Sequence, residues 1–133
     1  MGGLGTRHDY KKHRGDEYDI SFTVVDDDGD PVDISAAATT DLSWGFATLD
    51  TTQEFPAPLG ALIGTAKTIG SGITIIDGVN GDAQVTLESA DTNGQGAGKY
   101  YHELQYTDPT GRVSTILYGI MELVKDLHEP GPT

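Results

Sequence analysis

The sequence contains no cysteine, and this absence removes several classes of protein at once. A disulfide-stabilised scaffold, a zinc site built from thiolates and a cysteine nucleophile are all excluded. The sequence also lacks any apolar run that approaches the roughly 18 residues a membrane-spanning helix needs. We therefore expect no membrane-spanning segment in this chain.

Basic residues are scarce and unevenly placed. The 133 residues include 8 Lys and Arg against 21 Asp and Glu, which gives a net charge of −13. Residues 1–14 carry four basic residues and one acidic residue, a net charge of +3, whereas residues 15–133 carry −16. Because such an acidic body repels nucleic acid and anionic membranes, we expect neither as a partner.

The first 14 residues form a basic segment without an apolar period, separated from the first strand by Gly15. This pattern predicts an extended arm over residues 1–14, disordered alone or ordered against a partner. A solvated tail that happens to be basic is the alternative. Fully extended, the segment reaches about 45 Å, enough to strap a neighbouring acidic subunit. The candidate partner-binding residues of the arm are its four cations, Arg7, Lys11, Lys12 and Arg14.

Alternation of apolar and polar residues predicts strands along the rest of the chain. In the segment Leu42–Ala47 the alternation places the single tryptophan, Trp44, in the core. The count is about seven strands with no convincing helix, which indicates an all-β fold, an antiparallel immunoglobulin-like β-sandwich over residues 15–126. A loose tail is expected at residues 127–133. The predicted strands are 19–25, 32–34, 42–47, 73–76, 83–87, 99–107 and 113–124.

Turn residues connect these segments. Asn80-Gly81 is typical of a hairpin in which φ must be positive, and Asp108–Gly111 fits a β-turn. Val32–Ile34 and Val113–Val124 are candidate edge strands that could extend the sheet of a neighbour.

Residues 50–72 are rich in proline and glycine and give no clear periodicity. A long structureless loop in a compact domain is uncommon unless it has a function. The stretch Leu59–Ile63 predicts a short strand or one helical turn, or alternatively an exposed loop whose apolar tip packs on a partner. On the second interpretation the partner-binding residues of the loop are Leu59, Leu62 and Ile63.

Residues with catalytic chemistry do not form a recognisable motif. His102 lies within a predicted strand among tyrosines, where a hydrogen-bonded structural role is favoured. The glycines of Gly94–Gly98 precede a strand instead of a helix, so the helix dipole that would hold phosphate is missing. We expect no enzyme activity, no catalytic residues and no cofactor.

The acidic run Asp26–Asp30 is the best candidate for a metal site, because calcium prefers several oxygen ligands from one loop. The glycine and glutamate spacing of a calcium-binding loop is absent, since Gly29 is the fourth residue of the run and no glutamate follows nearby. A solvated acidic turn is therefore favoured, and no metal is predicted.

Several short motifs, taken in order along residues 14–125, resemble a known group of proteins. Together they are similar to small β-sandwich virion proteins of tailed bacteriophages, in particular to the N-terminal domain of phage baseplate upper proteins. The resemblance does not cover residues 50–70. The motifs are Arg14-Gly15-Asp16, Pro31-Val32-Asp33-Ile34, Gly72-Ile73-Thr74-Ile75, Val85-Thr86-Leu87, Ala90-Asp91-Thr92, Gly98-Lys99-Tyr100-Tyr101, Leu104-Gln105-Tyr106-Thr107-Asp108, Gly111-Arg112-Val113 and Leu117-Tyr118-Gly119.

The resemblance implies a structural protein located in the virion, either a tail or baseplate accessory or a capsid-decorating protein. It would act by non-covalent docking to other virion proteins, capsid or tail subunits, and would form a homo-oligomer within the particle. The chain ends near residue 133 without the stalk that follows in baseplate upper proteins, which leaves the position in the particle open. A carbohydrate-binding or host-adhesion module is the alternative, with Trp44, Tyr101 and Tyr118 as stacking residues.

Overall fold

The computed structural model describes residues 6–92 and 94–125. Residues 1–5 of the expected arm and the expected tail at 127–133 lie outside the described residues. The described ranges contain no helix with the length and hydrophobicity needed to span a membrane. Their strands are β1 (Thr6–Arg7), β2 (Tyr10–His13), β3 (Tyr18–Thr23), β4 (Leu42–Thr48), β5 (Lys67–Ile69), β6 (Gly72–Asp77), β7 (Asp82–Leu87), β8 (Gly98–Thr107) and β9 (Val113–Val124), with single helical turns at Gly78–Asn80 and at α1 (Ser89–Thr92).

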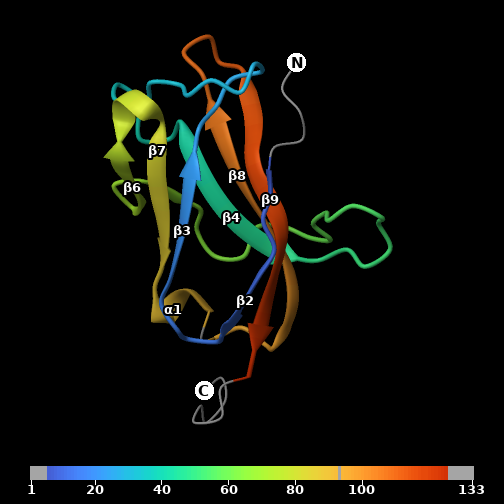
Figure 1. Ribbon diagram of the computed structural model, residues 1–133. Helices are drawn as coiled ribbons and strands as arrows, with labels where there is room; N and C mark the ends of the chain where they lie inside the picture. Colours follow the sequence, from blue (N-terminus) through green and yellow to red (C-terminus); the bar gives the residue numbers. More distant parts are fainter. Residues whose placement is uncertain (1–5, 93, 126–133) are drawn as a thin grey trace.

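The strands form one curled sheet around a single core (Figure 1). Their order is β1-β9-β8-β4-β5-β6-β7-β3, and β2 also pairs with β9. The all-β prediction is confirmed. The sheet is mixed instead of purely antiparallel, because β1 and β2 run parallel to β9 and β5 runs parallel to β6.

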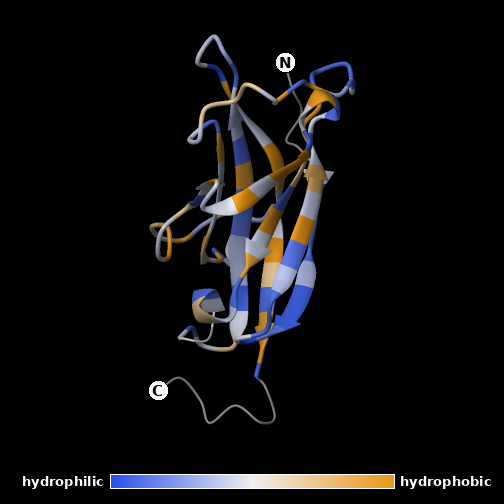
Figure 2. Cartoon of the chain, turned by 90° about the vertical axis from the view of Figure 1, so that its left-hand side faces the viewer, coloured by the Kyte–Doolittle hydropathy of each residue, from blue (hydrophilic) through white to orange (hydrophobic). Residues whose placement is uncertain are grey.

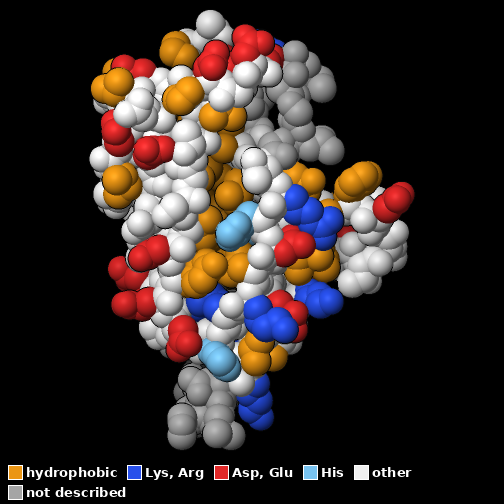
Figure 3. Space-filling view, viewed as in Figure 1, with side chains coloured by type: hydrophobic (Ala, Val, Ile, Leu, Met, Phe, Trp, Pro, Cys, Tyr) orange, Lys and Arg blue, Asp and Glu red, His pale blue; other side chains and the backbone are white. Residues whose placement is uncertain are grey.

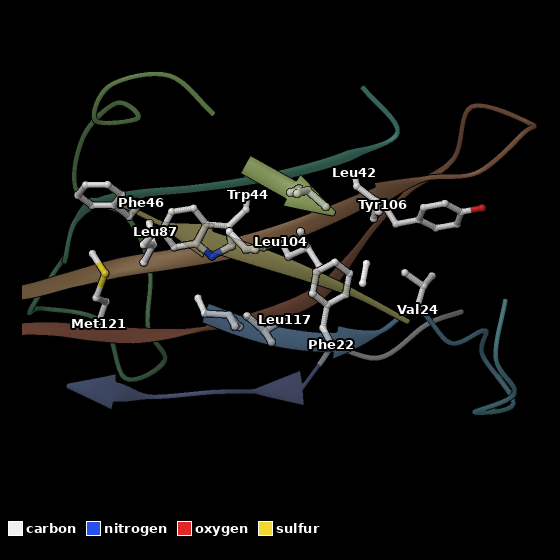
Figure 4. Packing of buried hydrophobic residues seen from close by; sticks show 14 of the residues in the cluster. Phe22, Val24, Leu42, Trp44, Phe46, Leu87, Leu104, Tyr106, Leu117 and Met121 are labelled. Carbon is white, nitrogen blue, oxygen red and sulfur yellow. The ribbon is translucent and has the colours of Figure 1, made fainter. Parts of the chain in front are cut away.

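Alternating side chains fill the inside of this sheet, as the banding of apolar and polar residues along the strands in Figure 2 shows. Trp44 is 1% exposed and lies among side chains from both halves of the sheet (Figure 4). The inward residues of β3 and β7, such as Phe22 and Leu87, face those of β4, β8 and β9, such as Leu104 and Met121. The core is therefore one layer of side chains enclosed by the curled sheet.

The hairpin of β8 and β9 is the longest element of the fold. Its turn is fixed by Asp108, whose Oδ1 accepts hydrogen bonds from the backbone N–H groups of Thr110 and Arg112 at 2.9 Å. Gly111 follows with a φ of 89°, a conformation that glycine adopts without strain. This turn places Thr107 opposite Val113 and aligns the two strands down to Gly98 and Leu123.

The edges of the sheet differ from those expected. The segment 113–124 is an internal strand, since β8 lies on one side and β1 and β2 lie on the other. Residues 32–34 form no strand: Val32 N–H donates to the Val24 carbonyl and Ile34 N–H donates to the Gly78 carbonyl. The outer strands of the described sheet are β3 at one end and β1 and β2 at the other.

Within the described residues the sheet already includes Thr6, ahead of the expected domain boundary at residue 15. Strands β1 and β2, here called the N-terminal strands, are extended as expected but lie along β9 of the same chain. Gly119 makes this close approach possible, because a Cβ at this position would overlap the His8 carbonyl and lie 2.6 Å from Asp9 Oδ1. The Asp9 carboxylate uses the space to accept a hydrogen bond from Ile120 N–H at 2.9 Å.

The variant Gly119→Ala is expected to displace the N-terminal strands while the rest of the sheet stays folded. The new methyl group meets backbone at His8, which cannot rotate away, so we expect a loss of about 1–3 kcal/mol in the free energy of unfolding. Limited proteolysis followed by mass spectrometry should show faster cleavage within residues 6–15. Gly96→Ala is the matched control, since a Cβ there has no neighbour within 4 Å. Equal cleavage rates in the two variants would contradict this role of Gly119.

Candidate interaction surfaces

The four cations predicted as partner-binding residues of the arm point to two different sides. Arg7 is exposed, with its Nε 3.1 Å from Asp9 Oδ2, and Lys11 is exposed with its Nζ 4.0 Å from Glu122 Oε1. Lys12 and Arg14 are buried, at 6% and 3% exposure. Only Arg7 and Lys11 are therefore accessible to a partner while the N-terminal strands lie on β9.

The Lys12 side chain is buried, and its ammonium group donates a hydrogen bond to a hydroxyl. Its Nζ donates to Thr92 Oγ1 at 2.9 Å, and the same oxygen accepts Gly15 N–H at 3.0 Å. Burial lowers the pKa of Lys12, and the nearby carboxylates of Asp16 and Asp91 oppose this shift only in part. Thr92, a residue that sequence reasoning did not single out, thus fastens both the end of β2 and the following turn.

Arg14 is the more weakly satisfied of the two buried cations. Its Nη1 donates to the Gln95 carbonyl at 3.1 Å, whereas its Nε is buried without a hydrogen-bond partner among the described residues. The burial of Arg14 also keeps it out of reach of a partner that binds the surface of this domain.

His102 joins the N-terminal strands to the centre of the core. The indole Nε1 of Trp44 donates to His102 Nδ1 at 3.2 Å, and His102 Nε2 lies 2.6 Å from the His8 carbonyl oxygen. Because an indole N–H only donates and a carbonyl only accepts, the imidazole must be neutral with its hydrogen on Nε2. Burial lowers the pKa of His102 to about 4. The predicted structural role of this histidine is confirmed.

Acid is expected to weaken the fold through His102. The unfolded histidine takes up a proton near pH 6.5 and the folded one only near pH 4, so stability is full above the first value and falls toward the second. The shift corresponds to about 3 kcal/mol in the free energy of unfolding. Urea titrations between pH 7 and pH 4 measure this loss. His102→Gln, which offers a donor and an acceptor without a titration, should flatten the slope above pH 5. An unchanged slope in that variant would show that another group carries the dependence.

The variant Thr92→Val is expected to cost about 2–4 kcal/mol in the free energy of unfolding, because it leaves a buried ammonium and Gly15 N–H without their acceptor. Lys12→Met is the matched variant, since it removes the charge and keeps the length of the side chain. We expect its stability to equal or exceed that of the unchanged protein. Chemical denaturation of both variants at pH 7 tests the pair. A larger loss for Lys12→Met than for Thr92→Val would contradict the analysis.

Residues 50–62 form a loop that projects from the end of β4, here called the projecting loop (green, on the right of Figure 1). Its base is fastened by backbone hydrogen bonds: Leu59 N–H donates to the Thr48 carbonyl at 2.7 Å, and Asp50 N–H to the Ala57 carbonyl at 2.9 Å. Asp50 Oδ1 accepts hydrogen bonds from the backbone N–H and the side-chain hydroxyl of Thr52, and these hydrogen bonds lower the pKa of Asp50. The loop is thus a wide hairpin with an ordered base.

The projecting loop exposes large apolar side chains. Leu59 and Leu62, both predicted as partner-binding residues, are 66% and 48% exposed. Ile63, the third predicted residue, is half-buried and packs against the core. Phe55, which the sequence analysis did not select, is 60% exposed. Its position inside a stretch of proline and glycine was the available signal, because such a residue has no strand to bury it.

Leu62 also covers the outer face of the sheet. Its side chain fills the space that a Cβ on Gly45 would occupy. Between the loop and the outer faces of β4 and β8 lies a shallow groove of about 270 Å³, lined among others by Ser43, Tyr101 and Glu103. The Tyr101 hydroxyl donates to Glu103 Oε1 at 2.6 Å, and burial raises the pKa of Tyr101.

The acidic turn that was considered for calcium gathers three exposed carboxylates. One oxygen atom from each of Asp26, Asp28 and Asp30 lies within 4.8 Å of the others. Asp26 Oδ1 accepts the backbone N–H groups of Asp28 and Asp30, both at 2.9 Å. The Asp26 carboxylate therefore has a structural use within the turn itself.

The stacking residues considered for carbohydrate binding are mostly enclosed. Trp44 is 1% exposed and Tyr101 is 8% exposed, so neither offers a ring face to a sugar. A scan against protein-family models and a search of curated proteins found no match for this chain.

Proposed function

We propose that this chain is a structural protein of a tailed-bacteriophage virion, a tail or baseplate accessory or a capsid-decorating protein. It docks non-covalently to neighbouring virion subunits and has no catalytic role. The observation that carries the proposal is the projecting loop, which holds Phe55 and Leu59 in solvent on an ordered base. The motif order along residues 14–125 supports the assignment to a virion.

Exposed aromatic and aliphatic side chains gathered on one projection are typical of a binding site. Single apolar residues are common on protein surfaces, but a cluster on a loop offers an anchor that a partner's pocket can enclose. The three exposed apolar residues of the loop extend over residues 55–62. The short, hydrogen-bonded base limits the conformational entropy that docking costs.

The charge pattern supports docking to an acidic partner beside the loop. In Figure 3, basic side chains gather over the N-terminal strands and β9, close to the projecting loop and with a few acidic side chains among them, and further acidic side chains lie toward β3 and β7 and at the top of the view. Arg7 and Lys11 are the exposed cations of the N-terminal strands. These exposed cations would attract an acidic surface of a neighbouring subunit toward the N-terminal strands.

We propose further that the curled sheet is a variant of the immunoglobulin-like sandwich. One half consists of β4, β8, β9 and the N-terminal strands, the other of β6, β7 and β3, and the two halves share one core. Among the described strands, β5 alone, three residues long, bridges them, by pairing with β4 and β6. If β5 is a corner between two sheets, the predicted sandwich and the single continuous sheet describe the same arrangement.

The test is to recover the chain from purified particles of the phage whose genome encodes it. Quantitative mass spectrometry should find a fixed copy number per particle. A protein carrying Phe55→Ser and Leu59→Ser should occupy the particle at least about tenfold less, since losing two apolar anchors costs 1.4 kcal/mol or more. Ile76→Ser with Val79→Ser is the matched control, because both residues are exposed apolar positions outside the loop.

Absence of the chain from purified particles would refute the proposed function. Equal occupancy by the loop variant and the control would refute the role of the loop alone.

A further inference from the structure

We infer that the N-terminal strands exchange between two copies of this chain, so that β9 of each copy receives β1 and β2 of the other. The interaction surface is the edge of β9, and its partner is residues 6–14 of a second copy. The inference rests on the proposed function for its role in an assembly, whereas the exchange itself is a property of the purified chain.

The backbone pairing of these strands is confined to one edge of the sheet. The backbone of β1 and β2 pairs with β9 and with no other strand of the described sheet. Detaching them breaks that ladder and leaves the pairs of β9 with β8, and of β3 with β7, in place. Such a strand is a removable unit.

Two buried polar atoms of residues 6–14, here called the N-terminal segment, lack hydrogen-bond partners among the described residues. The buried side-chain nitrogens that lack a hydrogen-bond partner in the described ranges are His8 Nε2 and Arg14 Nε, and both belong to this segment. Lys12 adds a buried ammonium whose side-chain hydrogen bond is to the neutral Thr92 hydroxyl. Because unsatisfied buried groups oppose burial, the segment is held less firmly than the rest of the sheet.

A hinge lies where an exchange requires one. Gly15 has a φ of 79° in the turn between β2 and β3, and this turn is closed by Asp16 N–H donating to the His13 carbonyl at 3.2 Å. Straightening the turn carries residues 6–14 away from their own β9 while β3 stays paired with β7. Nine extended residues span about 30 Å, enough to reach an adjacent copy.

The receiving edge accepts the partner's strands with the contacts already described. Tyr10 would lie opposite Met121 and Lys11 opposite Glu122, with His8 bonded to His102 beside Gly119. The stack of Tyr10 on Tyr18, with ring centroids 4.5 Å apart, would be reproduced in the same way.

The absence of native cysteine allows a direct test. Lys11→Cys and Glu122→Cys are made in separate chains, which are mixed, incubated and oxidised. These positions are register partners and exposed, so both variants are expected to fold. A disulfide between the two chains forms only if the strands of one lie on β9 of the other. The double variant, with both substitutions in one chain, verifies that the pair closes.

The control mixture pairs Lys11→Cys with Val79→Cys, an exposed position away from β9. We expect the Lys11–Glu122 heterodimer to exceed the control by about a thousandfold, because paired strands hold thiols at millimolar effective concentration against micromolar in free solution. Gly15→Ala should raise the dimer fraction in light scattering, since alanine disfavours the positive φ of the closed turn.

A heterodimer yield equal to that of the Val79 control, with the double variant closing only within single chains, would overturn the exchange. That result would leave the proposed function intact, because the projecting loop is tested separately in the particle.

Discussion

The hydrogen bonds of one buried imidazole determine how the N-terminal strands meet the core. His102 accepts from Trp44 and donates to the His8 carbonyl, so the central tryptophan and the N-terminal strands are fastened to the same ring. Both bonds require the neutral imidazole. Because the ring is fully enclosed, the position of the N-terminal strands depends on the protonation of a side chain that solvent does not reach.

This arrangement separates the molecule into a firm body and two appended parts. The body holds the core, whose buried members come from β3, β4 and β6 to β9 and from Val24 and Ile34 in the segment between β3 and β4. The N-terminal strands are paired with β9, and the two buried side-chain nitrogens without a partner in the described ranges belong to His8 and Arg14, which flank β2. The projecting loop is fastened at its base and exposes apolar side chains beyond it. A protein that works by contact gains from such parts, because each can change without repacking the core.

The sequence predicted the long strands well and the short ones poorly. Strands β4, β8 and β9 have an apolar period of two over at least seven residues, so the sequence predicted both their positions and which of their side chains point into the core. β5 has three residues and β1 has two, too few for a period to be visible. The sequence of β2 predicts a solvated basic tail, because it contains two lysines and the sequence does not show that Lys12 is buried. Parallel pairing with β9 is a tertiary contact, and no local pattern encodes it.

The candidate surfaces were predicted only in part, because exposure also depends on tertiary contacts that the local sequence does not show. For Leu59–Ile63 the predicted short strand or helical turn is wrong, because the structure has no strand or helix there, and the alternative of an exposed loop holds for Leu59 and Leu62. The local sequence could not separate the accessible Arg7 and Lys11 from the buried Lys12 and Arg14, because only the alternation of a paired strand divides them.

The most direct test of a body with detachable N-terminal strands is native-state hydrogen exchange followed by NMR. The amides of His8 and Arg14, which donate to β9, are compared with that of Leu104 in the middle of β8. The account predicts that the first two exchange through a local opening of lower free energy, insensitive to low denaturant. Exchange of all three amides at the same free energy, with the same denaturant dependence, would contradict it.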